Sequence, residues 1–100
     1  MIDREALILR QCKALGEAQR WNMLELLHKP TTVTVLAQIM GIRQSVVSHH
    51  LQILLDVKLV TYLSSGQYKL YQTREQELSG ISVMIENLAT FKKDSSNETI

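Results

Sequence analysis

A stripe of polar side chains interrupts an otherwise apolar stretch in the middle of the sequence. If this stretch is helical, at about 100° per residue, five side chains fall on or beside one face: Gln44, Ser45, Ser48, His49 and Gln52. Each of them can both donate and accept hydrogen bonds, whereas a face that serves solubility alone more often carries Lys and Glu. Short uncharged groups of this kind pair with base edges in the major groove of DNA. The stripe therefore predicts a DNA-binding surface.

The opposite side of the same helix carries the residues expected to face the core: Val47, Leu51, Leu54 and Leu55. Asp56 continues the polar stripe at the C-terminal end, where a carboxylate would repel phosphate. The N-terminal half, which begins at Arg43, is therefore the half expected to enter the groove. Val46 projects sideways from this half, where it could touch a thymine methyl group.

The residue patterns of enzymes and metal sites are missing from the sequence. It has no paired carboxylates, no Ser/His/Asp arrangement and no glycine-rich phosphate loop, so we expect neither enzyme activity nor a cofactor. A single cysteine, Cys12, excludes an internal disulfide and every multi-thiolate zinc site. The neighbours His49 and His50 point too far apart on a helix to share a metal ion.

Hydrophobic periodicity predicts four helices, then a β-hairpin, then a closing helix. The expected helices span residues 2–15, 17–28, 33–40 and 43–57, the strands residues 59–63 and 68–71, and the last helix residues 74–92. In the second helix, one face carries Trp21, Leu24 and Leu27, with Met23 beside them.

The third and fourth helices are joined by a short turn with recognisable start and stop signals. Thr31 and Thr32 offer a hydroxyl N-cap for the third helix, and Gly41 offers the left-handed conformation that ends it. Two helices joined by such a turn and followed by a two-stranded wing form a known DNA-docking arrangement. The expected fold class is mostly α with a two-stranded β-hairpin, a winged helix-turn-helix.

Length and composition fit one folded domain of 100 residues, with 45% hydrophobic and 21% charged side chains. We expect a single domain at 1–92, followed by a flexible tail at 93–100. The domain would contain a helix-turn-helix at about 32–57, a wing at about 59–73 and a dimer helix at about 74–92.

Charge is distributed unevenly along the chain, although the net charge is only +1. Residues 43–74 carry four basic side chains against one acidic, whereas residues 75–100 carry two basic against five acidic. A basic middle suggests contact with an anion. No apolar run approaches the ~18 residues needed to span a bilayer, so we expect a cytoplasmic protein without membrane contact.

The last helix carries a long apolar stripe that another surface must cover. Its residues Leu78, Ile81, Met84, Ile85 and Leu88 follow helical spacing. A monomer of this size buries only roughly 60–70% of its unfolded surface, so we expect a homodimer in which this stripe pairs across a twofold axis together with Leu9 and Cys12 of the first helix. Two recognition helices would then lie about 34 Å apart and bind an inverted repeat in double-stranded DNA.

The segment from Met40 to Leu51 resembles the helix-turn-helix of the ArsR/SmtB family of bacterial winged-helix repressors. Its specific part is Gln-Ser-Val-Val-Ser-His-His-Leu, and the resemblance extends over roughly residues 12–90. It implies a homodimer that dimerises through its first and last helices and places its wing near the DNA backbone. Carried over by position, it implies DNA contacts for Gln44, Ser45, Ser48 and His49, with His50 close by.

Three positions depart from the family pattern. Arg43 replaces the usual serine N-cap, which removes about 1 kcal/mol of capping but adds a cation near phosphate. Lys58 replaces the common glycine at the end of the helix, so the turn there is expected to differ. The wing lacks the arginines often found at its tip and offers only Lys69.

The metal-sensing positions of the family hold other residues in this chain. Thr32 and Thr34 stand where the arsenic and cadmium type has Cys-x-Cys. Residues 75–92 contain no Asp or His, the ligands that the zinc and nickel type places on the last helix. Thiol-switch members need two cysteines, and this chain has one. We therefore expect no metal site of a known type.

These observations together predict a dimeric transcriptional regulator, a repressor, that binds a palindromic operator through the helix at 43–57. One alternative is a winged-helix module whose polar face binds a protein, since the wing is only modestly basic. A second alternative keeps the DNA role and makes Cys12 a redox switch between subunits.

Overall fold

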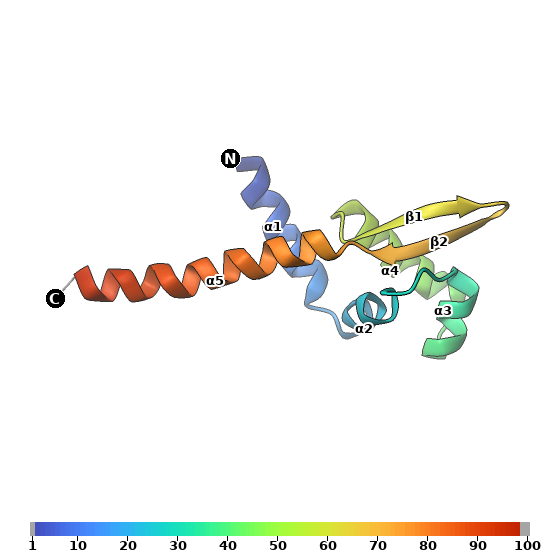
Figure 1. Ribbon diagram of the computed structural model, residues 1–100. Coiled ribbons are helices and arrows are strands. Elements are labelled where there is room, and N and C mark those ends of the chain that lie inside the picture. The colour runs from blue at the N-terminus through green and yellow to red at the C-terminus, as the bar shows by residue number, and fades with distance from the viewer. Residues whose placement is uncertain (1, 99–100) are drawn as a thin grey trace.

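The protein folds into five helices and one β-hairpin in the predicted order (Figure 1), and the computed structural model describes residues 2–98, with side chains described for residues 3–90. The elements are α1 (Ile2–Leu15), α2 (Ala18–Leu26), α3 (Val33–Met40), α4 (Gln44–Asp56), β1 (Val60–Ser65), β2 (Tyr68–Thr73) and α5 (Glu75–Glu98). Within the described residues, no helix is long and apolar enough to cross a membrane.

The helix boundaries follow the sequence closely except at α2 and α5. The bounds of α1 and α3 are those predicted, and α4 is one residue shorter at each end. The second helix ends at Leu26, short of the expected residue 28. The last helix continues to Glu98 and extends away from the other elements (Figure 1), so residues 93–98 are helical where we expected a tail.

The hairpin forms an antiparallel wing that projects from the side of the molecule opposite to the end of α5 (Figure 1). Both strands are longer than predicted, and their register runs from Val60 opposite Thr73 to Ser65 opposite Tyr68. Gly66 takes a φ of 62° in the tight turn between the strands, a conformation that costs glycine little.

Thr31 connects the wing to the start of the helix-turn-helix. Its N–H donates to the carbonyl of Tyr71 at 3.0 Å, and the Tyr71 N–H donates back to the carbonyl of Thr31 at 2.9 Å. The chain entering α3 is thereby fixed against β2, so the wing and the helix-turn-helix are held together by backbone hydrogen bonds.

The core lies where α2, α3 and α4 meet the base of the wing. Its most deeply buried side chains come from these elements and their connections: Met23, Leu27, Leu36, Val47, Leu51, Leu54 and Leu59. Leu24 and Leu27 are buried, but Trp21, which shares a face with them in the helical pattern, is 56% exposed. The buried side of α2 centres on Met23 and Leu24, and Trp21 is turned about 160° from Met23, so it borders a surface cavity instead.

The helices of the helix-turn-helix differ in how their ends are capped. The Thr32 hydroxyl accepts a hydrogen bond from the Val35 N–H at 3.2 Å, and Gly41 ends α3 in the left-handed conformation with φ 69°. Arg43 precedes α4 and makes no side-chain capping bond. Lys58 follows α4 with φ 65°, a left-handed conformation that is costly for a residue with a side chain.

Candidate nucleic-acid interface

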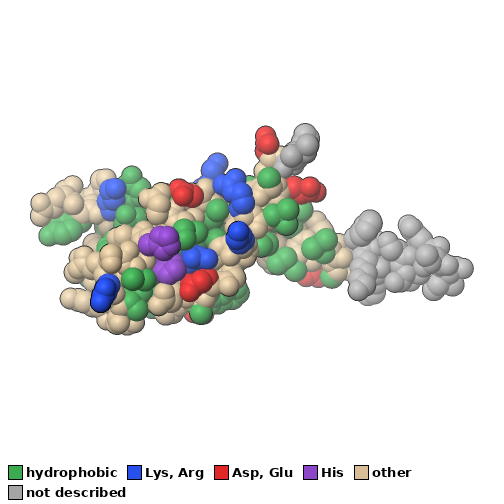
Figure 2. All heavy atoms as spheres, turned by 180° about the vertical axis from the view of Figure 1, so that it is seen from behind, with side chains coloured by type: hydrophobic (Ala, Val, Ile, Leu, Met, Phe, Trp, Pro, Cys, Tyr) green, Lys and Arg blue, Asp and Glu red, His purple; other side chains and the backbone are tan. Residues whose placement is uncertain are grey.

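The polar stripe of α4 lies at the surface, as the sequence predicts. All five of its side chains are exposed: Gln44, Ser45, Ser48, His49 and Gln52. Arg43 is exposed at the start of the helix, and Val46 is half-buried beside the stripe. Figure 2 shows histidine side chains over α4 with lysine and arginine side chains on the same face of the molecule. The amphipathic α4 thus leaves an uncharged hydrogen-bonding surface open to solvent.

The two halves of the stripe are not equally free to bind. At its C-terminal end the Gln52 amide Nε2 donates to the Asp56 carboxylate at 2.9 Å, one turn further along α4. The amide is thereby partly engaged within its own helix, next to an exposed negative charge. The N-terminal half, around Ser45 and Ser48, makes no such bond among the described side chains. This difference favours the N-terminal half for contact with a polyanion.

His50 points into the protein and is removed from the expected DNA contacts. It is 8% exposed, and its Nδ1 lies 3.1 Å from Nη1 of Arg20 while its Nε2 lies 2.9 Å from Oε1 of Gln19. Because a guanidinium only donates, Nδ1 accepts and Nε2 carries the proton that it donates to Gln19. Burial lowers the pKa of His50 below 6.5, which favours this neutral form. The ring fastens α4 to α2 instead of facing solvent.

Arg20 extends this connection to the end of α1. Its Nε donates to the Ala14 carbonyl at 2.8 Å, and its own N–H donates to the Glu17 carboxylate at 2.9 Å, which caps α2. That backbone hydrogen bond lowers the pKa of Glu17 below 4.5. The beginning of α2 is thus a junction that links α1 to α4 through Arg20 and His50.

A second polar connection holds the C-terminal end of α4. Gln11 of α1 is 1% exposed, and its Nε2 donates to the Val57 carbonyl at 2.9 Å and to the Glu77 carboxylate of α5 at 2.8 Å. Arg10 of α1 adds a longer contact to the Asp56 carbonyl at 3.4 Å. Sequence reasoning missed Gln11, although Leu7 and Leu15 lie one turn before and after it. A polar residue between apolar neighbours on one helix face is the signal that could have revealed it.

The wing carries a single cation. Lys69 is the only charged residue between Leu59 and Thr73 in the sequence. Its Nζ lies 4.6 Å from the centre of the Tyr62 ring, which stacks at a tilt on Tyr71 with ring centres 5.5 Å apart. A cation over an aromatic face is held in place but remains available to an anion. Lys69 is therefore an exposed cation held against the aromatic side chains of the wing.

The residues expected at the dimer interface differ in how far they are exposed. Leu9 on α1 and Met84, Ile85 and Leu88 on α5 are exposed, and Leu9 and Leu88 are the most exposed at 69% and 70%. Cys12 and Leu78 are half-buried. Ile81 is only 3% exposed because it packs into the core of its own subunit, so its assignment to the dimer interface was wrong.

The described residues offer no metal-binding cluster, since no group of three or more His, Cys, Asp and Glu side chains lies close enough together. Thr32, at one position where a thiolate ligand would be required, is occupied as the N-cap of α3. The geometry around α4 and the wing instead suits hydrogen bonding and charge contacts with an extended anionic partner.

Comparison with known proteins also indicates a helix-turn-helix domain. Residues 15–62 match a family model described as a helix-turn-helix domain. Over 71 residues the chain is 37% identical to the arsenical resistance operon repressor of Bacillus subtilis (strain 168), and the match covers 69% of this chain and 68% of that protein. The matched region of the family model includes both α3 and α4.

Solved structures share the whole architecture. An ArsR-like transcriptional regulator from Rhodococcus sp. RHA1 matches with a TM-score of 0.85 at 20% identity, covering 92% of this chain and 88% of that one. The homodimeric winged helix-turn-helix DNA-binding domain of a possible ArsR-family transcriptional regulator from Mycobacterium bovis matches with a TM-score of 0.73 at 22% identity, covering 89% and 83%. At these identities the similarity establishes the winged helix-turn-helix fold.

Proposed function

The chain belongs to the ArsR family of winged helix-turn-helix transcriptional regulators, and on that premise we propose that it is a homodimeric repressor that binds an inverted-repeat operator through α4. It is a DNA-binding regulator rather than an enzyme. The observation that carries the proposal is the exposed, uncharged polar stripe on a helix whose opposite side is buried in the core. Such side chains can replace the water on base edges in the major groove.

Each exposed residue around α4 has a role in this proposal. Gln44, Ser45, Ser48 and His49 make hydrogen bonds to bases and neighbouring phosphates, and Val46 touches a thymine methyl group. Gln52 contributes at the edge of the interface, where its bond to Asp56 must first be exchanged. Arg43 and Lys69 contact phosphates from the start of α4 and from the wing.

The exposed apolar side chains of α1 and α5 support the dimer. Leu9, Met84 and Leu88 leave an apolar surface that a second copy would bury, with Cys12 beside it and Ile85 at its edge. Twofold pairing through these helices would set two copies of α4 about 34 Å apart, one turn of DNA. We propose that the regulator works in the cytoplasm and that no known metal-sensing site controls it.

Alanine substitution at the stripe tests the proposal directly. Replacing Gln44 or Ser48 with alanine should weaken operator binding by about 1–3 kcal/mol in a mobility-shift titration, because each loses a base contact. Gln76→Ala on the first turn of α5, also exposed, should leave affinity unchanged. Equal binding by all three variants and the parent would refute the role of α4.

Salt dependence separates DNA binding from the alternative of a protein-binding module. Affinity for duplex DNA should fall as salt rises, because each neutralised phosphate releases counterions. With about 6–10 phosphate contacts, affinity changes by orders of magnitude between 50 and 200 mM salt. If binding to duplex DNA does not change over this range, the protein-binding alternative is favoured.

The redox alternative is tested at the single cysteine. A Cys12→Ser variant with an unchanged peroxide response would dismiss it.

A further inference from the structure

A cavity of about 420 Å³ lies between α2 and α5, away from the DNA-facing stripe. This volume is within the range of small-molecule sites in proteins. Its walls are mainly apolar and come from both helices, with Leu24 on α2 and Leu78 and Ile85 on α5. None of the residues proposed above to contact DNA lines this cavity, so the DNA contacts do not account for it.

Trp21 gives the cavity an exposed aromatic surface. This tryptophan, the only one in the sequence, is 56% exposed and lines the cavity opposite the side chains of α5. An indole is the aromatic ring that attracts cations most strongly through its face. A large apolar side chain left open in a concave site is typical of a binding surface.

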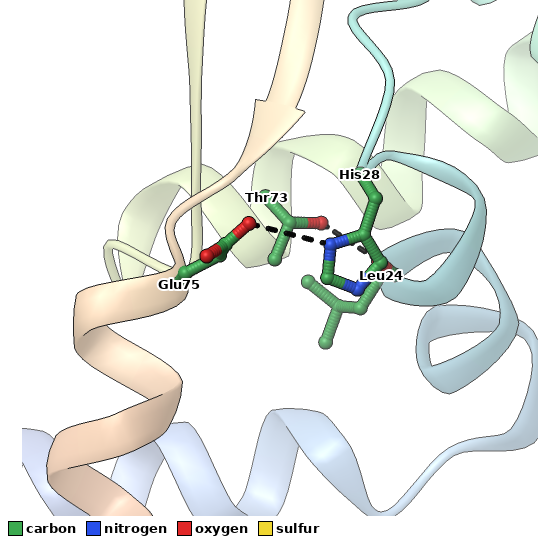
Figure 3. Close-up of polar contacts among 4 residues, drawn as sticks. All are labelled: Leu24, His28, Thr73 and Glu75. Atoms are coloured by element: carbon green, nitrogen blue, oxygen red, sulfur yellow. Dashed lines mark hydrogen bonds and ion pairs between the residues drawn. The ribbon is translucent and has the colours of Figure 1, made fainter.

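The charged groups of the cavity are acidic. Glu25 of α2 and Glu86 of α5 line it from its two walls, and both are exposed. The described lining residues include no lysine or arginine. The histidine of the lining, His28, lies with its Nδ1 3.6 Å from a carboxylate oxygen of Glu75 at the rim (Figure 3). Two carboxylates beside an indole favour a ligand with positive charge.

We propose that this cavity binds a hydrophobic organic cation, an apolar body carrying a tertiary or quaternary ammonium group. The apolar body would lie against Leu24, Leu78 and Ile85, and the ammonium group would lie over Trp21 between Glu25 and Glu86. An anionic ligand would meet only repulsion from these carboxylates, and a neutral one would leave them unused.

The proposed dimer surface adjoins the cavity on α5. At about 100° per residue, Met84 and Leu88 are turned by about 60–100° from Ile85, and Ile81, which also lines the cavity, lies between Ile85 and Leu88. Ile85 borders both surfaces, so a second copy of the chain is the competing occupant of the cavity. Ligand binding requires that the dimer leave Trp21 and the two carboxylates accessible.

The cavity is connected to the DNA-binding elements through α2. Trp21 follows directly after Arg20, which holds His50 of α4. One turn later, the Leu24 carbonyl accepts a hydrogen bond from the Thr73 hydroxyl at 2.7 Å, which anchors the end of β2 (Figure 3). A ligand that displaces α2 would thus disturb both α4 and the wing. This coupling rests on the proposed DNA-binding function, whereas ligand binding itself does not.

Fluorescence of the single tryptophan measures binding without DNA. The dimeric protein is titrated with phenylbutyltrimethylammonium, with 4-phenylbutanol as neutral analogue and 4-phenylbutyrate as anionic analogue. We expect a saturable fluorescence change with the cation and an affinity at least about tenfold lower for the anion. No saturable change, or equal affinity for cation and anion, would overturn the proposal.

Charge-neutral variants locate the site. Glu25→Gln combined with Glu86→Gln should reduce affinity for the cation by about five- to tenfold and leave affinity for the alcohol unchanged. Glu5→Gln, an exposed position on α1 outside the cavity, is the matched control. Equal losses for cation and alcohol would contradict a charge-selective site.

A quenching experiment tests the second copy of the chain as the competing occupant. Acrylamide should quench Trp21 efficiently in the dimer if the cavity is open. A tryptophan that becomes shielded as the protein dimerises would show that the partner subunit fills the cavity, which would overturn the proposal. Mobility shifts with and without the cation then test the coupling alone, since failure of DNA binding would leave the fluorescence result intact.

Discussion

The two helices of the helix-turn-helix are stabilised in different ways. The supporting helix α3 carries its own end signals, with Thr32 at its start and Gly41 at its end. The second helix, α4, which carries the polar stripe, has neither, since Arg43 makes no capping bond and Lys58, not glycine, occupies the left-handed conformation after its end. Local capping contributes about 1 kcal/mol at a helix start, so α4 begins with a local deficit that α3 does not have.

Contacts from other elements compensate for this deficit. His50 fastens α4 to Gln19 and Arg20 of α2, and Gln11 of α1 holds the carbonyl of Val57 at the far end. Both attachments lie away from the exposed polar stripe. Because α4 is held from its buried side, the polar side chains of its N-terminal half stay exposed. Side chains of α1 and α2 therefore help to hold α4 in place.

Removing the attachment at Gln11 should have the largest effect. Gln11→Ala leaves the buried Val57 carbonyl and the partly buried Glu77 carboxylate without their donor, so unfolding should become easier by about 1–3 kcal/mol. Chemical denaturation measures this change, and operator affinity of the folded variant should also fall. Gln76→Ala on the exposed side of α5 is the control. Unchanged stability would mean that α1 does not hold α4.

Substituting the N-cap residues of the two helices should change the stability of the protein in opposite directions. Thr32→Ala removes the cap of α3 and should cost about 1 kcal/mol, whereas Arg43→Ser offers α4 a cap and should stabilise by about 0.5–1 kcal/mol. Thermal unfolding of both variants measures the difference. Arg43→Ser should weaken DNA binding despite its higher stability, because it removes the proposed phosphate contact. A stabilised variant with stronger DNA binding would contradict the role of Arg43.

Removing the left-handed strain at Lys58, after the end of α4, should have a smaller effect on stability. Lys58→Gly removes a left-handed penalty of roughly 1–2 kcal/mol, partly offset by the greater freedom of glycine in the unfolded chain. The variant should be more stable by about 0.5–1 kcal/mol. Lys58→Ala, which keeps the penalty, should not share this gain. Equal stability of the glycine and alanine variants would argue against strain at this position.

The last effect is a gradual dependence on pH through His50. Burial lowers the pKa of His50 in the folded protein, so the unfolded chain takes up the proton first as the pH falls below about 6.5. Stability from this group is complete above that pH and is lost as the pH falls toward the lowered pKa. His50→Gln should flatten the stability profile between pH 7 and 5.5. A parent profile as flat as that of the variant would contradict the buried, neutral ring.

Several structural outcomes were out of reach of helical periodicity. His50 lies only about 40° from Leu54 on the helical wheel, at the edge of the core arc, so whether it is buried depends on what packs beside α4. His50 is buried because Gln19 and Arg20 of α2 lie beside it and hydrogen-bond to its ring. Ile81 and Leu88 lie on one apolar stripe of α5, yet only Ile81 is covered by its own subunit.

The sequence by itself determined the order of elements, the polar stripe from Gln44 to Gln52 and the turn at Gly41. These depend on local backbone preference and on a fixed angle per residue, which hold in any tertiary surrounding. Only the tertiary structure decided which polar residues turn inward and that Trp21 borders a cavity. Burial is a property of two packed surfaces, and a periodic pattern describes only one of them.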